Sequence, residues 1–131
     1  MSPDPNDRTS TILVVDDEYL LRATLSDYLQ ECGFKVLEAS SADEAVAILE
    51  KTGVDLVLTD VRMPGAMNGF GLARWIRANR PSMQVILTSG AASKTEAAKQ
   101  LCENEPFFEK PYKLEAVVAQ IRSSLHRSSS P

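Results

Sequence analysis

The chain has 131 residues, of which 44% are hydrophobic, and its formal net charge is −4, from 14 Lys and Arg against 18 Asp and Glu. This length fits one domain with its own core and excludes a second domain of ordinary size. The acidic balance disfavours nucleic-acid binding, because that function usually requires a basic surface.

The two cysteines, Cys32 and Cys102, lack the spacing of metal ligands. Two thiols in a chain of this size indicate reduced, intracellular residues rather than a disulfide framework. The sequence begins without the basic and apolar regions of a secretory signal, and no apolar run reaches membrane-spanning length. We therefore expect a cytoplasmic protein with no membrane contact.

The two ends of the chain differ in composition from its middle. Residues 1–10 are polar and contain two prolines, and residues 127–131 are mostly serine. Such segments offer little apolar surface for a core, so we expect both to be disordered. The remaining residues, 11–126, are expected to form one folded domain.

Strand and helix patterns alternate in the first part of this domain. Residues 11–15 are aliphatic and β-branched, and residues 34–39 form a second short strand pattern. A helical stripe lies between them, made up of Leu21, Leu25, Tyr28, Leu29 and Cys32. Gly33 fits the position just after the end of this helix. Ser41 and Glu44 form a capping box that predicts the start of a second helix.

The third predicted strand is the most continuously apolar. Residues 54–60 read Val-Asp-Leu-Val-Leu-Thr-Asp, which is typical of a strand buried on both faces of a parallel sheet, and the run ends in Asp60. A loop at residues 61–69, rich in Pro and Gly, leads to a third helix. The stripe of that helix is Leu72, Ala73 and Ile76. Residues 85–88 form a fourth buried strand that ends in Thr88.

The last part of the domain predicts one weak helix and one strong one. Residues 91–105 favour a helix in composition but are weakly amphipathic, so we expect a helix that is short or mobile. Phe107 and Phe108 form a brief fifth strand that leads to Lys110. The clearest helical stripe follows, made up of Leu114, Val117, Val118, Ile121 and Leu125.

Five strand–helix pairs predict an α/β fold, with a parallel sheet covered by helices on both faces. Right-handed crossovers leave few topologies, and the simplest is the flavodoxin-like, doubly wound sheet of five strands and five helices in the order 2-1-3-4-5. Ligands of such sheets bind outside the carboxyl ends of the strands. The polar residues predicted at that edge are Asp16, Asp17, Asp60, Thr88 and Lys110.

These side chains suggest phosphoryl chemistry. Three carboxylates at one edge would repel one another unless a cation neutralised them, and hard oxygen ligands with open positions favour Mg²⁺. A carboxylate can also act as a nucleophile that forms an aspartyl phosphate. The ammonium of Lys110 and the hydroxyl of Thr88 would then contact the transferred group, because phosphoryl transfer is catalysed mainly by positioning and charge neutralisation.

The motifs at the strand ends resemble those of the receiver domain of two-component response regulators. The resemblance rests on residues 14–17, 58–64, 87–89 and 109–111, in the family's order, and covers about residues 11–126. It implies a stand-alone receiver that accepts a phosphoryl group from a histidine kinase or a histidine phosphotransfer protein. The output would be contact with an unknown downstream protein, without a DNA-binding output domain. We expect a monomer or weak dimer.

The resemblance also implies roles for the carboxylates. Asp60 would be the phosphoacceptor, and it would take part in binding Mg²⁺. Asp17 would be a direct ligand of the metal, and Asp16 a largely water-mediated one. The backbone carbonyl of Arg62 would complete the protein's share of the metal site.

Three further residues are implied to sense the phosphoryl group. Thr88 would move toward it, Lys110 would be its ion-pair partner, and Phe107 would be the aromatic switch that swings inward. The peptide bond between Lys110 and Pro111 is usually cis in such proteins. This chain departs from the usual pattern in two places. The loop after the phosphoacceptor is longer and has Asn68 where Asp is common, and Phe107 replaces the more usual Tyr or His.

Other functions stay open on these residues. The family resemblance implies a signalling domain that assists its own phosphorylation and dephosphorylation, and not an enzyme with a separate substrate. A degenerate receiver that binds partners without phosphorylation is the main alternative. A Mg²⁺-dependent phosphatase would share the aspartyl-phosphate chemistry, but it needs a substrate-covering cap for which no residues remain.

Overall fold

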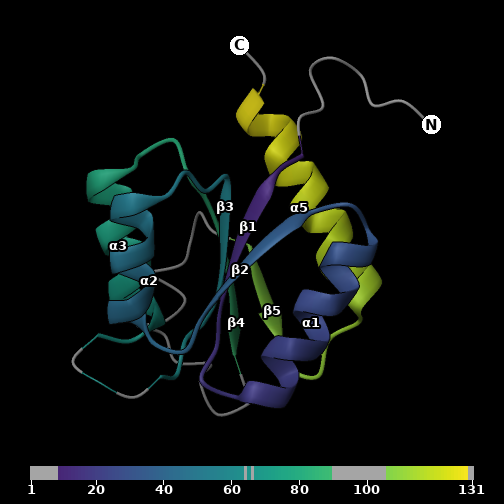
Figure 1. Ribbon diagram of the computed structural model, residues 1–131, viewed down its shortest axis with the longest axis horizontal. Coiled ribbons are helices and arrows are strands. Elements are labelled where there is room, and N and C mark those ends of the chain that lie inside the picture. Colours follow the sequence, from purple (N-terminus) through teal and green to yellow (C-terminus); the bar gives the residue numbers. More distant parts are fainter. Residues whose placement is uncertain (1–8, 64, 66, 90–105, 130–131) are drawn as a thin grey trace.

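The computed structural model describes residues 9–63, 65, 67–89 and 106–129, and in it five parallel strands form a single sheet (Figure 1). The strands are Thr11–Val15 (β1), Lys35–Ala39 (β2), Leu56–Asp60 (β3), Gln84–Ser89 (β4) and Phe107–Glu109 (β5). Their order across the sheet is β2-β1-β3-β4-β5, so the predicted fold class and topology are confirmed. The carboxyl ends of the strands face the lower edge of Figure 1.

Four helices are described, and they cover both faces of the sheet. They are Tyr19–Glu31 (α1), Ala42–Lys51 (α2), Gly69–Asn79 (α3) and Leu114–Ser129 (α5). In Figure 1, α2 and α3 lie on one side of the sheet and α1 and α5 on the other. The helix predicted within residues 91–105 lies outside the described residues. Helix α5 extends to Ser129, three residues beyond the expected end of the folded domain at residue 126.

The core is divided into two layers by the sheet, because successive side chains of a strand point to opposite faces. In β1, Leu13 and Val15 pack with the buried side chains of α2 and α3. Ile12 and Val14 pack with those of α1 and α5. All five residues of β3 are buried. This burial on both sides explains the continuous apolar pattern of that strand, and it anchors its carboxyl end rigidly.

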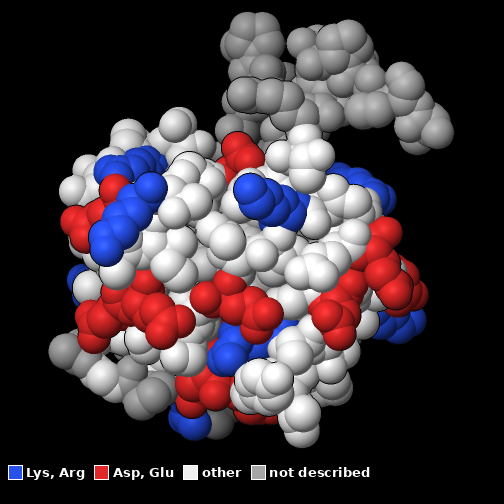
Figure 2. All heavy atoms as spheres, in the orientation of Figure 1, with Lys and Arg blue, Asp and Glu red and all other residues white. Residues whose placement is uncertain are grey.

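Charged groups are mixed on the surface. On the face shown in Figure 2, carboxylate groups form a band across the middle and lower part, and basic groups lie at the upper edge and among the carboxylates.

Within the part of the chain that the structure describes, no helix is both long enough and apolar enough to span a membrane.

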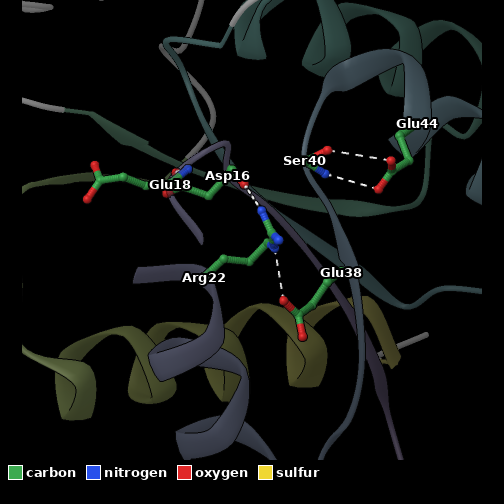
Figure 3. A network of polar contacts seen from close by, with 6 residues as sticks. All are labelled: Asp16, Glu18, Arg22, Glu38, Ser40 and Glu44. Carbon is green, nitrogen blue, oxygen red and sulfur yellow. Dashed lines mark hydrogen bonds and ion pairs between the residues drawn. The ribbon is translucent and has the colours of Figure 1, made fainter. Parts of the chain in front are cut away.

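The end of α1 and the start of α2 lie at the residues that the sequence predicts. Gly33 has a φ of 99° just after α1, in the left-handed region that glycine adopts without strain. The hydroxyl of Ser41 accepts a hydrogen bond of 3.1 Å from the backbone N–H of Glu44, as expected for the N-cap of α2. Glu44 accepts a bond of 3.1 Å from the backbone N–H of Ser40 (Figure 3). The reciprocal half of the capping box is therefore shifted by one residue.

We expect Ser41→Ala to lower the free energy of unfolding by about 1 kcal/mol, because it leaves the N–H of Glu44 without its side-chain acceptor. Urea denaturation followed by circular dichroism measures this change. Ser40→Ala is the matched control, since its hydroxyl makes only a 3.5 Å exposed contact with Glu44 and its backbone N–H is retained. Equal effects of the two substitutions would contradict the assigned cap.

Candidate functional site

Backbone pairing brings the polar strand ends to one edge of the sheet. Asp60 at the end of β3 is the register partner of Thr88 in β4. The N–H of Val61 donates a hydrogen bond of 2.8 Å to the carbonyl of Thr88, which continues the pairing one residue past β3. The N–H of Lys110 donates a bond of 2.7 Å to the carbonyl of Ser89. The segment after β5 is thereby tied to the end of β4, beside Asp60.

Gly69 allows α3 to begin directly against the end of β3. Its N–H donates to the carbonyl of Val61 at 2.9 Å. A Cβ at this position would overlap the carbonyl oxygen of Asp60 and would lie 2.7 Å from the Cα of Val61, so a larger residue requires the backbone to shift. Asn68 caps the helix by accepting a bond of 2.9 Å from the N–H of Gly71. Asn and Asp are comparably good N-caps, so the departure at Asn68 preserves the local structure.

Three carboxylates meet at this edge. Asp16 and Asp60 are buried, with 4% and 6% of their surface exposed, and Asp17 is exposed. One carboxylate oxygen of each lies within 4.8 Å of the other two. Two of these acids are buried and one faces solvent. A ligand can therefore reach the cluster from solvent, while the charges of Asp16 and Asp60 are poorly hydrated.

Among the described residues, Lys110 is the cation that contacts these carboxylates. Its Nζ donates a hydrogen bond of 3.2 Å to Oδ2 of Asp16 and lies 3.6 Å from Oδ1 of Asp60. One ammonium cannot balance three carboxylates, so the described groups carry an excess of negative charge. A set of clustered carboxylate oxygens with uncompensated charge is suited to a hard divalent cation such as Mg²⁺.

Burial and the excess of carboxylates over ammonium groups determine the pKa values of the site. Burial raises the pKa of Asp60 to about 6, Lys110 opposes the shift, and Asp16 and Asp17 add to it. Burial alone would lower the pKa of Lys110, but the carboxylates of Asp16 and Asp60 outweigh it and the pKa is raised. Lys110 therefore stays charged at neutral pH. Burial, followed by the same two carboxylates and Glu18, raises the pKa of Tyr112 to about 12, which keeps its phenol neutral.

Every polar group of Asp16 has a partner. Its N–H donates to the carbonyl of Ala39 at 3.1 Å, and its Oδ1 accepts from the N–H of Glu18 at 2.9 Å. Its Oδ2 accepts from Lys110, and its carbonyl oxygen accepts from Arg22 at 2.7 Å (Figure 3). These contacts reach β2, α1 and the segment after β5. Asp16 therefore fixes the end of β1 relative to the rest of the site.

Three predicted site residues lie near this edge without a described contact to the carboxylates. Thr88 is 2% exposed and is paired with Asp60 in register. Phe107 is partly buried and pairs with Leu87. Its ring packs against the apolar core layer between the sheet and helices α2 and α3. Arg62 follows Asp60 by two residues and is exposed. The Lys110–Pro111 bond is cis, as predicted.

The sequence reasoning missed Arg22, Gly69 and Tyr112 as parts of this region. Arg22 stands in the helical stripe between Leu21 and Leu25, and a charged residue on the inner side of a helix indicates a buried partner. In the sequence, Gly69 is one of two glycines in the loop at residues 61–69, and nothing there distinguishes it from Gly65. Tyr112 follows the Lys110–Pro111 pair and packs edge-on against Phe108, with ring centroids 6.3 Å apart. The sequence carries no separate signal for that contact.

The family model of the response regulator receiver domain matches residues 12–122 of this chain. The chain is 35% identical over 91 residues to the autoinducer 1 sensor kinase/phosphatase LuxN of Vibrio campbellii, a match that covers 70% of this chain and 11% of LuxN. It is 31% identical over 118 residues to the transcriptional regulatory protein ResD of Bacillus subtilis, which covers 90% of this chain and 49% of ResD. This chain thus spans half or less of the length of these curated relatives.

Solved structures show the same architecture. A response regulator receiver protein from Sinorhizobium medicae WSM419 superposes with a TM-score of 0.84 at 28% sequence identity, and the match covers 93% of this chain and 98% of that one.

The raised pKa of Asp60 makes the stability of the fold depend on pH. Its pKa is about 6 in the folded chain against an ordinary value of 3.8, so the folded state binds a proton between these pH values that the unfolded state has lost. Stability therefore falls as pH rises from about 4 to 6, and the loss is complete above pH 6. A shift of this size corresponds to roughly 3 kcal/mol.

Asp60→Asn removes this penalty, so we expect it to raise the free energy of unfolding at pH 7 by roughly 3 kcal/mol. The gain should vanish near pH 4. Chemical denaturation in EDTA at several pH values measures the gain at pH 7 and its loss near pH 4. Asp27→Asn removes the same charge from an exposed position on α1 and serves as the control. An advantage of Asp60→Asn that does not change with pH would contradict the assigned electrostatics.

Proposed function

This chain belongs to the family of response regulator receiver domains, and we propose that Asp60 accepts a phosphoryl group from a phosphohistidine of a partner protein. The observation that carries the proposal is the buried carboxylate of Asp60 beside Asp16, Asp17 and Lys110. A carboxylate whose pKa is raised to about 6 is a stronger base than an ordinary aspartate, and it is still ionised at neutral pH. It can therefore act as a nucleophile toward phosphorus.

The transfer involves one bond formed and one broken. A carboxylate oxygen of Asp60 forms a bond to phosphorus, and the bond between phosphorus and the imidazole nitrogen of the donor breaks. The electron pair stays on the imidazole, which takes up a proton from solvent when required. Lys110 already lies 3.6 Å from Oδ1 of Asp60, so its ammonium is placed to neutralise charge on the phosphoryl oxygens. The product is an acyl phosphate on Asp60.

We assign Mg²⁺ to the acidic cluster. The donor set fits this ion, because three carboxylates within 4.8 Å supply hard oxygens and, among the described residues, the ammonium of Lys110 is the one cation that offsets their charge. Asp17 would hold the ion directly, Asp16 largely through water, and Asp60 and the carbonyl of Arg62 would contribute further oxygens. When bound, Mg²⁺ would neutralise the carboxylates and the incoming phosphoryl group.

We propose that Thr88, Lys110 and Phe107 report the phosphorylated state. Thr88 is buried directly opposite Asp60 in the sheet, and a hydroxyl at that place can donate a hydrogen bond to a phosphoryl oxygen. Phe107 pairs with Leu87, the residue before Thr88, so movement at the end of β4 would change the packing of its ring. A Phe lacks the polar atom of Tyr or His, and its two positions would differ by packing alone.

We propose a histidine kinase or a histidine phosphotransfer protein as the donor, and a protein as the downstream target. Figure 2 shows acidic and basic groups interspersed on one face, where the described residues make no continuous basic surface of the kind that nucleic acid requires. A cytoplasmic location, a monomeric or weakly dimeric state and the lack of a separate enzymatic substrate stay predictions. The alternative function is phosphorylation-independent binding by a degenerate receiver.

Acetyl phosphate with Mg²⁺ should add the mass of one phosphoryl group to the protein, because Asp60 can attack a small phosphodonor directly. Intact-mass spectrometry measures the addition, and hydroxylamine should remove it, as expected for an acyl phosphate. Asp60→Asn should stay unlabelled, whereas the control Asp27→Asn should be labelled like the wild type. An unlabelled wild type, or equal labelling of Asp60→Asn, would exclude Asp60 as the phosphoacceptor.

Isothermal titration calorimetry with Mg²⁺ separates the proposed function from the degenerate receiver. We expect saturable binding by the wild type that Asp17→Ala abolishes and Asp27→Asn leaves unchanged. The affinity should fall as pH drops below about 6, because protons then compete for the carboxylate of Asp60. A wild type without Mg²⁺ binding, or an Asp17→Ala variant that binds equally well, would favour the binding module.

A further inference from the structure

We propose that Arg22 is a positioning residue for the metal site, and that it acts by holding the peptide unit between Asp16 and Asp17. The inference rests on the proposed Mg²⁺ site and concerns a residue outside it. Arg22 lies in the first turns of α1, and one of its terminal nitrogens donates a hydrogen bond of 2.7 Å to the carbonyl oxygen of Asp16. Arg22 therefore reaches the backbone of the cluster and not its carboxylates.

The guanidinium of Arg22 is held on several sides. Its Nε donates to Oε1 of Glu38 at 2.9 Å, and its centre lies 5.4 Å from the centroid of the Tyr19 ring. The Arg22 side chain is 13% exposed. Figure 3 shows it between Glu38 on β2 and the end of β1. The guanidinium is planar, and its two acceptors, Glu38 and the Asp16 carbonyl, fix its orientation. It therefore loses little side-chain entropy in each contact and can hold the Asp16 carbonyl in one direction.

The Asp16 carbonyl is a sensitive place for such a contact. The other polar groups of Asp16 are engaged by Ala39, Glu18 and Lys110. The carbonyl shares a planar peptide unit with the N–H of Asp17, so its direction sets the course of the backbone into Asp17. Asp17 is exposed, and its carboxylate is placed by the backbone that leads into it. Without the Arg22 contact, the Asp17 carboxylate would therefore sample a wider range of positions relative to Asp60.

The charge of Arg22 alone predicts the opposite effect. A cation near a metal site repels the metal, so removing the charge of Arg22 would by itself strengthen Mg²⁺ binding. A positioning role predicts weaker binding when Arg22 is removed. The sign of the change in affinity thus separates the two roles.

The test is Mg²⁺ titration of the wild type, Arg22→Ala and Glu38→Gln by isothermal titration calorimetry. We expect Arg22→Ala to bind Mg²⁺ about 10-fold more weakly, a size typical of residues that orient metal ligands. Glu38→Gln keeps the hydrogen bond from Arg22 to Asp16 and changes only a partly exposed ion pair, so its affinity should stay within about twofold of the wild type. The Glu18 amide donates to Oδ1 of Asp16, and its hydrogen exchange in EDTA should be faster in Arg22→Ala than in Glu38→Gln, a difference that needs no metal.

Arg22→Lys is the second variant, because it keeps the charge and is the safest substitution for folding. Lys has a single donor group and cannot hold both acceptors, so we expect weaker Mg²⁺ binding than the wild type and stronger than Arg22→Ala. Wild-type affinity in Arg22→Lys and Arg22→Ala, tighter binding in Arg22→Ala, or an equal loss in Glu38→Gln would each overturn the inference. A wild type that binds no Mg²⁺ would overturn the proposed metal site and this inference together, whereas the other outcomes leave the metal site standing.

Discussion

The burial of the Asp60 carboxylate is the constraint on which the rest of the site depends. It is 6% exposed at the end of a strand whose five residues are all buried, and its pKa is raised to about 6. The negative charges of Asp16 and Asp17 raise this pKa further, and the positive charge of Lys110 offsets only part of the increase. Such a cluster weakens the fold, and it persists because both layers of the core anchor β3. A site that holds unbalanced charge can gain from binding a cation, which is a common compromise between stability and function.

The sequence predicted the sheet order well because its strands have strong and distinct patterns. The continuous run of β3 and the aliphatic run of β1 can hardly be placed elsewhere than in the centre of a parallel sheet. Strand boundaries were less accurate. Residues 54 and 55 precede β3 although Val54 is apolar, and there the carboxylate of Asp55 accepts a hydrogen bond of 2.8 Å from the N–H of Thr11. That contact is between segments far apart in sequence, and a local pattern cannot show it.

The candidate site was predictable where residue type determines chemistry, and less so where packing does. Asp16, Asp17, Asp60 and Lys110 converge as the strand ends implied. Arg22 was missed, because its partners are a backbone carbonyl and a carboxylate on β2, and neither has a sequence signature. The roles proposed for Thr88, Phe107 and Arg62 stay predictions, because they concern a phosphorylated or metal-bound state.

Lys110 connects the site to the sheet in a way that suggests how phosphorylation could be sensed. Its ammonium lies closer to Asp16 than to Asp60, at 3.2 Å against 3.6 Å, and its backbone N–H is bonded to Ser89 at the end of β4. In the proposed reaction the phosphoryl group adds negative charge on Asp60, which shifts the balance of attraction on Lys110 away from Asp16. The Ser89 contact is made by the backbone N–H of Lys110, so a shift of the Lys110 backbone that follows its ammonium would be shared by the end of β4, with Thr88 beside it. Phe107 pairs with that same strand, and the charge on one carboxylate would thus reach the packing beneath α2 and α3 through two adjacent strands.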